Sequence, residues 1–160
     1  RLTAPLMVGH RLMGSSLTLT GDGARGRMHY DQAMALYDPV AHRPLVTRFG
    51  QDVGVAALSY RSLALWVLGY PEAAQADNEA AVKDARVLGH GATLMLALIH
   101  TSITQVLFCG CYSTGKPSVN ELVALVEEKG ALFWKIVGAL LRAYLLADWQ
   151  HSRRNSDHQR

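Results

Sequence analysis

The chain has 160 residues, of which 49% are hydrophobic and 18% are charged. That length is enough for one domain with a substantial core, and the composition excludes a disordered or collagen-like chain. The net charge is +3 and three arginines lie in the last ten residues, so the body lacks the broad basic surface of a nucleic-acid binder. Leucine (23 residues) and alanine (21) dominate while isoleucine is rare (3), which favours an all-α fold over a β-sandwich.

Seven segments of helical periodicity follow one another, separated by glycine, proline or aspartate turns. Pro71 and Pro117 suit the first turn of a helix, where the missing N–H group costs nothing. We expect residues 1–150 to form one helical domain and residues 151–160 to form a polar, basic tail. The predicted helices are 5–20, 23–37, 53–68, 72–88, 92–109, 118–129 and 131–149.

The turns suggest an internal repeat of helical hairpins. Gly21, Gly69 and Gly110 each end a predicted helix, and the residues seven positions before them are Gly14, Ser62 and Ile103, the last with the small residue Ser102 adjacent. Small residues at equivalent places let two antiparallel helices approach closely, as stacked hairpins require. The sequence therefore predicts consecutive antiparallel hairpins, with Gly14 at a close helix crossing.

One long stretch tests whether the chain is soluble. Residues 87–115 contain no lysine, arginine, aspartate or glutamate, and a segment of that length could cross a bilayer. The stretch also contains histidines, threonines and glycines, and the mean hydropathy of the chain is only +0.06. We expect a buried helix of a soluble domain, with a membrane span as the alternative.

The two cysteines, Cys109 and Cys111, are separated by one residue. Cysteines at this spacing rarely bridge, so we expect small buried thiols at a helix end. A zinc site needs four ligands, and no second cysteine or histidine pair accompanies these two. A reducing compartment fits this cysteine usage, and no signal-peptide pattern opens the chain. We therefore expect a cytoplasmic protein without a metal or cofactor.

The helical pattern resembles a tetratricopeptide repeat (TPR), a helix-turn-helix unit with a conserved Gly-Asp turn. The likeness implies a solenoid of stacked hairpins with a peptide-binding groove on the first helix of each pair. The matching residues are Met13, Gly14, Gly21, Asp22, Tyr30, Ala33 and Pro39 in a first unit, Leu65, Gly69, Ala74 and Ala81 in a second, and Trp134, Val137 and Gly138 in another.

Several segments also resemble the C-terminal repeat region of large bacterial proteins that carry a nucleotide-cyclase-like domain and a predicted NTPase domain. The segments are 42–52, 58–71, 86–90 and 121–134. This resemblance implies a regulatory, non-catalytic part of a larger signalling protein. The catalytic domains of such proteins would lie outside this chain.

Two near-motifs offer a nucleotide-binding enzyme as the alternative. Residues 21–26 spell G-x-G-x-x-G, which binds dinucleotides when it joins a strand to a helix. Residues 110–116 spell G-x-x-x-x-G-K, but Pro117 stands where a phosphate-binding loop needs serine or threonine. No base paired with a nucleophile is evident, so we expect no enzymatic activity from this chain.

The favoured function is a protein–protein interaction or scaffolding module. Cationic residues among the expected groove positions favour an acidic peptide or a terminal carboxylate as the partner. The apolar helix 131–149 is a second candidate surface, for self-association. The expected groove residues are Arg11, Ser15, Tyr60, Trp66, His100, Thr104, Lys135 and Arg142.

Overall fold

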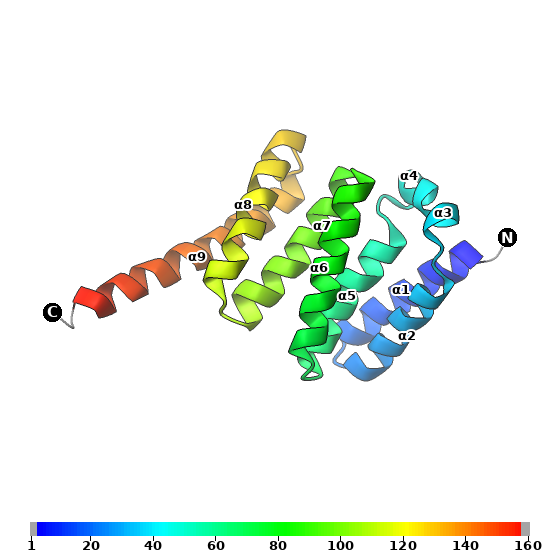
Figure 1. Ribbon diagram of the computed structural model, residues 1–160, viewed down its shortest axis with the longest axis horizontal. Helices are drawn as coiled ribbons and strands as arrows, with labels where there is room; N and C mark the ends of the chain where they lie inside the picture. The colour runs from blue at the N-terminus through cyan, green and yellow to red at the C-terminus, as the bar shows by residue number, and fades with distance from the viewer. Residues whose placement is uncertain (1–2, 158–160) are drawn as a thin grey trace.

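The computed structural model describes the backbone of residues 3–157 and the side chains of residues 3–147. This part of the chain is helical without a strand, which confirms the all-α prediction (Figure 1). The helices are α1 (Thr3–Leu19), α2 (Gly23–Leu36), α3 (Pro39–His42), the 3-10 turn η1 (Arg43–Leu45), α4 (Val46–Phe49), α5 (Val53–Val67), α6 (Pro71–Leu88), α7 (Gly91–Ser102), the π-helical segment η2 (Ile103–Phe108), α8 (Tyr112–Lys129) and α9 (Leu132–Asp157).

Three boundaries differ from the sequence prediction. Residues 38–52, expected as an irregular connection, contain α3, η1 and α4, because the Asp38 carboxylate accepts from the Val40 N–H and Pro39 opens a helical turn. α8 begins at Tyr112, so Pro117 lies inside the helix and not in its first turn. α9 continues to Asp157, across the boundary expected after residue 150. The side chains of the expected tail lie outside the described residues.

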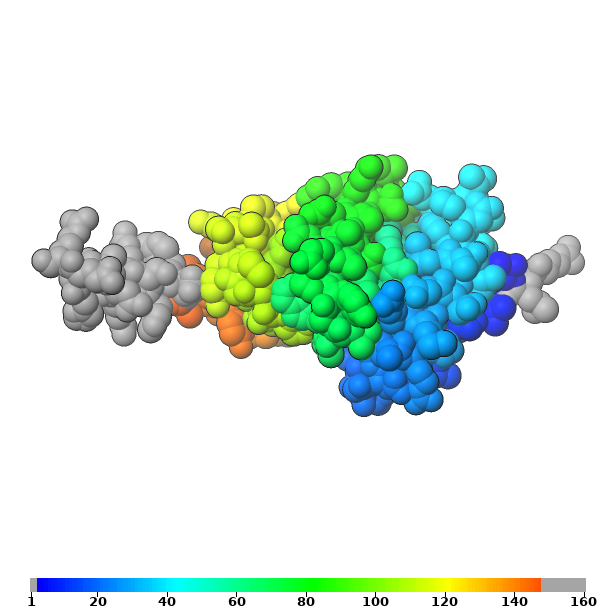
Figure 2. Space-filling model, turned by 60° about the horizontal axis from the view of Figure 1, so that its bottom comes forward, coloured from blue at the N-terminus to red at the C-terminus, as the bar shows by residue number. Residues whose placement is uncertain are grey.

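The helices pack in two layers. Short turns fold α2 back on α1, α6 on α5, α8 on α7 and α9 on α8, and each pair adjoins the next through α2 with α5 and α6 with α7. α1, α5, α7 and α9 thus form one layer, and α2, α6 and α8 form the layer in front of it in Figure 1. Figure 2 shows the same order along the surface, from the N-terminal helices at one end to α8 and the described part of α9 at the other.

The first pair, α1 and α2, crosses at two glycines. A Cβ atom on Gly14 would lie 2.8 Å from Cε1 of Tyr30 and 3.0 Å from the backbone oxygen of Gly26. A Cβ atom on Gly26 would lie 3.0 Å from the backbone oxygen of Gly14. The prediction that Gly14 sits at a close crossing is confirmed, and the chain reverses just after it at Gly21, whose φ of 93° favours glycine.

A branched ion pair joins the first two helix pairs. The Arg61 guanidinium on α5 donates through Nε and Nη2 to both carboxylate oxygens of Asp77 on α6, at 2.7 and 2.8 Å. Its Nη1 donates to Asp31 on α2 at 2.7 Å. These hydrogen bonds to Asp77, opposed by burial, raise the pKa of Arg61. The Arg61 side chain therefore bridges α2, α5 and α6 through its hydrogen bonds.

The largest core cluster lies among α5, α6, α7, α8 and α9. Leu98 of α7, Leu122 of α8 and Leu141 of α9 are fully buried there. The stretch Gly91–Phe108 is long and apolar enough to cross a membrane by length and composition, and 61% of it is buried inside this fold. Burial at the centre of the helical layers therefore accounts for the apolar composition of this stretch.

Candidate functional site

Three of the expected groove residues meet on the layer of α1, α5 and α7. The Arg11 guanidinium of α1 lies over the Tyr60 ring of α5, with its Cζ 5.9 Å from the ring centroid. The His100 ring, on α7, packs against the same Tyr60 ring in an edge-to-face arrangement, with the ring centroids 4.4 Å apart. Tyr30 of α2 stacks behind Tyr60 at 6.5 Å. We call Arg11, Tyr60 and His100 the aromatic–arginine cluster.

Arg11 has no carboxylate within 4 Å among the residues whose side chains are described. Its Nε atom is buried and makes no hydrogen bond. Burial lowers the pKa of Arg11, opposed by the nearby tyrosines. A half-buried guanidinium without an anion is costly, because desolvation is not repaid by an ion pair. The cluster therefore contains a cation that would gain from an external carboxylate or phosphate.

His100 is a neutral member of the cluster. It is 5% exposed, and burial lowers its pKa to about 4, against a smaller opposing effect of its hydrogen bond to the Leu96 carbonyl. Because a carbonyl only accepts, Nδ1 of His100 carries the hydrogen that is donated to Leu96 at 2.9 Å. The tautomer is fixed, and Nε2 of His100 is left as an acceptor.

Ser15 lies next to the cluster but its hydroxyl is already engaged. It donates to the Arg11 carbonyl at 3.1 Å and accepts from the buried Tyr30 hydroxyl at 3.4 Å. Thr104 and Trp66 lie elsewhere: Thr104 is 2% exposed and faces Asn78 of α6, and Trp66 packs near Phe108. Lys135 and Arg142 are exposed on α9. The structure therefore brings together four of the eight expected residues: Arg11, Ser15, Tyr60 and His100.

Neither nucleotide near-motif forms a phosphate-binding loop. A helix precedes Gly21 instead of a strand, and the Asp22 carboxylate caps α2 by accepting from the Arg25 N–H. Gly26 is buried against α1. In the second motif, residues 112–116 are helical and Gly115 packs against Val106. The glycines of both motifs serve helix packing and turns. The backbone N–H groups of these two segments therefore do not form an open loop that could surround a phosphate.

The expectation of two buried free thiols is wrong. Cys109 and Cys111 are joined in a disulfide, with their Cα atoms 5.1 Å apart, and Cys109 is exposed. The tight turn at Gly110, with φ 66°, brings the two Cα atoms within bridging distance. The argument for a reducing compartment from cysteine usage is thereby removed.

No group of three or more metal-ligating side chains occurs in the described region. Sequence reasoning missed Tyr30, which supports the cluster from the second layer, and the uncharged amide side chains of Asn78 and Gln105. Tyr30 could have been found from the sequence, because it matches a position of the repeat consensus, whereas no sequence pattern marks the two amides.

Comparisons with protein-family models, curated proteins and solved structures found no match.

Proposed function

We propose that this chain is a non-catalytic interaction module, built as a TPR-like array of helical hairpins, that binds an acidic peptide segment on the layer of α1, α5 and α7. The observation that carries the proposal is the half-buried Arg11, which has no acidic partner among the described side chains. The packing of consecutive helix pairs supports the array, since first helices lie beside first helices. The resemblance of several segments to cyclase-associated repeat regions supports the further proposal that the module is a regulatory part of a larger signalling protein.

The chemistry of the aromatic–arginine cluster fits a carboxylate better than a neutral ligand. A carboxylate can accept two parallel hydrogen bonds from a guanidinium, and Tyr60 holds that guanidinium in place from one side. His100 adds no charge, because burial keeps its pKa near 4. Charge selectivity therefore rests on Arg11, and the neighbouring rings provide the apolar surface around it.

The test is the binding of two labelled peptides, one of five glutamates and one of five glutamines, followed by fluorescence anisotropy. We expect the glutamate peptide to bind and the Arg11→Gln variant to weaken it about tenfold or more, the magnitude of a hydrogen bond to a charged group. Arg48→Gln is the matched control, because Arg48 is exposed on α4, outside the cluster. Equal binding of both peptides, or an unchanged affinity in Arg11→Gln, would contradict the proposal.

A second mode of interaction, self-association through α9, is favoured by a separate observation. One side of α9 packs on the core through Leu141, which is 1% exposed, whereas Phe133, Ile136 and Leu140 are 67%, 65% and 55% exposed. Phe133, Ile136, Leu140, Ala143 and Ala147 follow the alternating spacing of three and four residues that seats one helix against another. We propose a second copy of α9 as the occupant. Leu141 lies within the apolar segment 131–149 that the sequence offered for self-association, but it is buried in the core and is not part of this exposed strip.

A further inference from the structure

An open hollow of about 300 Å³ lies where α1 and α2 meet, and it shares no residue with the aromatic–arginine cluster. His10 and Met13 of α1 and His29 of α2 line it, and Pro5 and Leu6 add apolar atoms. No carboxylate occurs among the described residues that line the hollow. It therefore presents two imidazoles and one thioether, which are ligands for a soft metal ion, without the oxygen ligands that magnesium and calcium prefer.

The two histidines bring their Nδ1 atoms together across the helix pair. These atoms are 2.9 Å apart, whereas the ring centroids are 5.1 Å apart and the ring planes are inclined by 38°. The rings therefore converge at Nδ1. Two nitrogens that each lie about 2.05 Å from a metal ion, at an angle of about 90°, are about 2.9 Å apart. The separation in the structure thus matches that of two adjacent ligands on one ion.

The close crossing of α1 and α2 holds the two histidines at this separation. Gly14 lies one turn after His10, and Gly26 lies one turn before His29. A Cβ atom on either glycine would lie 3.0 Å from the backbone oxygen of the other, so the two helices are in close contact there. Because the backbone fixes the spacing of the pair, little ordering of the chain is needed when an ion binds.

Met13 supplies a third ligand. Counting histidine, cysteine, aspartate and glutamate alone, the part of the chain that is described has no group of three that could hold a metal. Met13 follows His10 by three residues on α1, lines the same hollow and is 50% exposed. Its side chain is unbranched and flexible, so the sulfur atom can reach an ion held by the histidines. Thioether sulfur selects Cu(I) over the harder divalent ions.

We propose that His10, Met13 and His29 bind one Cu(I) ion, through the two Nδ1 atoms and the thioether sulfur. This departs from the sequence expectation of a chain without a metal, and it does not depend on the proposed peptide binding. The ion replaces the hydrogen bond between the two rings. The ring that donates in this bond carries its hydrogen on Nε2 instead, so that both Nδ1 atoms offer a lone pair and the neutral pair releases no proton.

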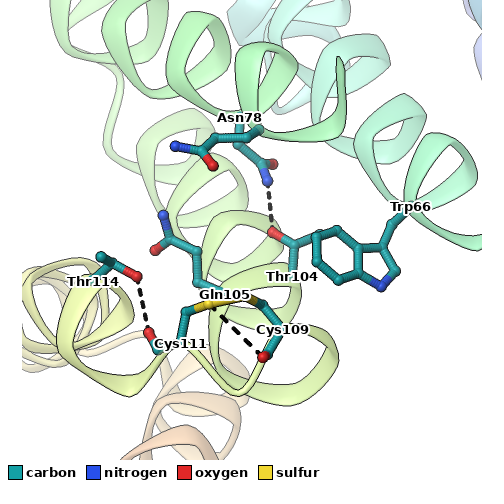
Figure 3. A pocket seen from close by; sticks show the side chains of 8 residues that line it. Trp66, Asn78, Thr104, Gln105, Cys109, Cys111 and Thr114 are labelled. Carbon is teal, nitrogen blue, oxygen red and sulfur yellow. Dashed lines mark hydrogen bonds between the residues drawn. A yellow bond between two sulfur atoms is a disulfide. The ribbon is translucent and has the colours of Figure 1, made fainter. Parts of the chain in front are cut away.

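The test is a titration of the full chain with Cu(I), kept reduced by ascorbate in the absence of oxygen, in competition with the coloured Cu(I) complex of bicinchoninate. Cys109 and Cys111 are joined in a disulfide (Figure 3), and a thiol assay before each titration verifies that their sulfurs do not compete. We expect one ion to bind per chain and His29→Gln to weaken binding about 100-fold, the upper end of the loss for residues that only orient a metal ligand.

The matched variants are Met13→Leu and Met28→Leu, which make the same change at the hollow and at an exposed position of α2 outside it. Both side chains are at least half exposed, so circular dichroism should remain native. Met13→Leu should weaken Cu(I) about tenfold and remove the sulfur signal from the copper X-ray absorption spectrum, whereas Met28→Leu should change neither. No bound Cu(I), an unchanged affinity in His29→Gln, or an unchanged affinity and spectrum in Met13→Leu would each overturn the proposal.

Discussion

Replacing Gly14 by alanine should destabilise the protein, although alanine is the better helix former. In an open helix the change stabilises by about 1 kcal/mol. Here the added Cβ would lie 2.8 Å from the Tyr30 ring and 3.0 Å from the Gly26 carbonyl oxygen. Tyr30 is fully buried and the Gly26 oxygen belongs to the backbone, so neither can move aside cheaply. Overpacking of this kind costs about 1–3 kcal/mol, and the backbone contact favours the upper end of that range.

The net effect should be a loss of about 1–2 kcal/mol for Gly14→Ala, which corresponds to a melting temperature about 3–6 °C lower in a chain of this size. Gly9→Ala is the matched control, since it makes the same change in α1 at a position with no atom within 4 Å of the added Cβ. That variant should melt about 2–4 °C higher. Thermal unfolding followed by circular dichroism measures both, and an equal stabilisation by the two variants would refute the close crossing.

Two further predictions concern acid stability and self-association. The pKa of His100 in the folded state is about 4, which lies below its unfolded value. Between about pH 6.5 and pH 4 the unfolded chain therefore binds more protons than the folded one. The free energy of unfolding should fall as the pH drops through that window, by up to roughly 3 kcal/mol. Urea unfolding of His100→Gln should show a smaller loss between pH 7 and pH 4.5, and an unchanged pH dependence would assign the loss to other groups. For α9, sedimentation at micromolar concentration should show wild-type dimers that Ile136→Glu dissociates, whereas Val87→Glu, at an exposed site on α6, leaves them intact. A monomeric wild-type chain contradicts this mode.

The sequence predicted the features that depend on local pattern. Leucine- and alanine-rich periodicity gave the all-helical fold, and the repeat alignment placed Gly14 at a crossing that the structure confirms. Arg11, Tyr60 and His100 were expected on one face because each lies on the first helix of a pair, and they do meet.

The features that were missed depend on contacts between distant segments. Pro117 suggested a helix start, but α8 begins earlier, where the packing of Gly115 against Val106 favours helical backbone over a loop. Thr104 was expected on the groove, yet the π-helical turn directs it to Asn78, and periodicity of 3.6 residues cannot anticipate such a turn. The unpaired oxygens of Asn78 and Gln105 depend on which residues surround them in space.

The branched ion pair at Arg61 sets how the N-terminal part of the molecule can come apart. In repeat arrays each hairpin usually contacts only its neighbours, so terminal units can fray independently. Separating α2 from α5 would leave the partly buried guanidinium of Arg61 with Asp77 alone, and separating α5 from α6 would remove both hydrogen bonds to Asp77. Both openings are therefore penalised through one side chain. The segment from α1 to α6 should exchange its amide hydrogens as one cooperative unit. In the described part of the chain, α8 and α9 contact this segment mainly through α7, η2 and the exposed Arg86–Glu121 pair, and they should form a less protected unit.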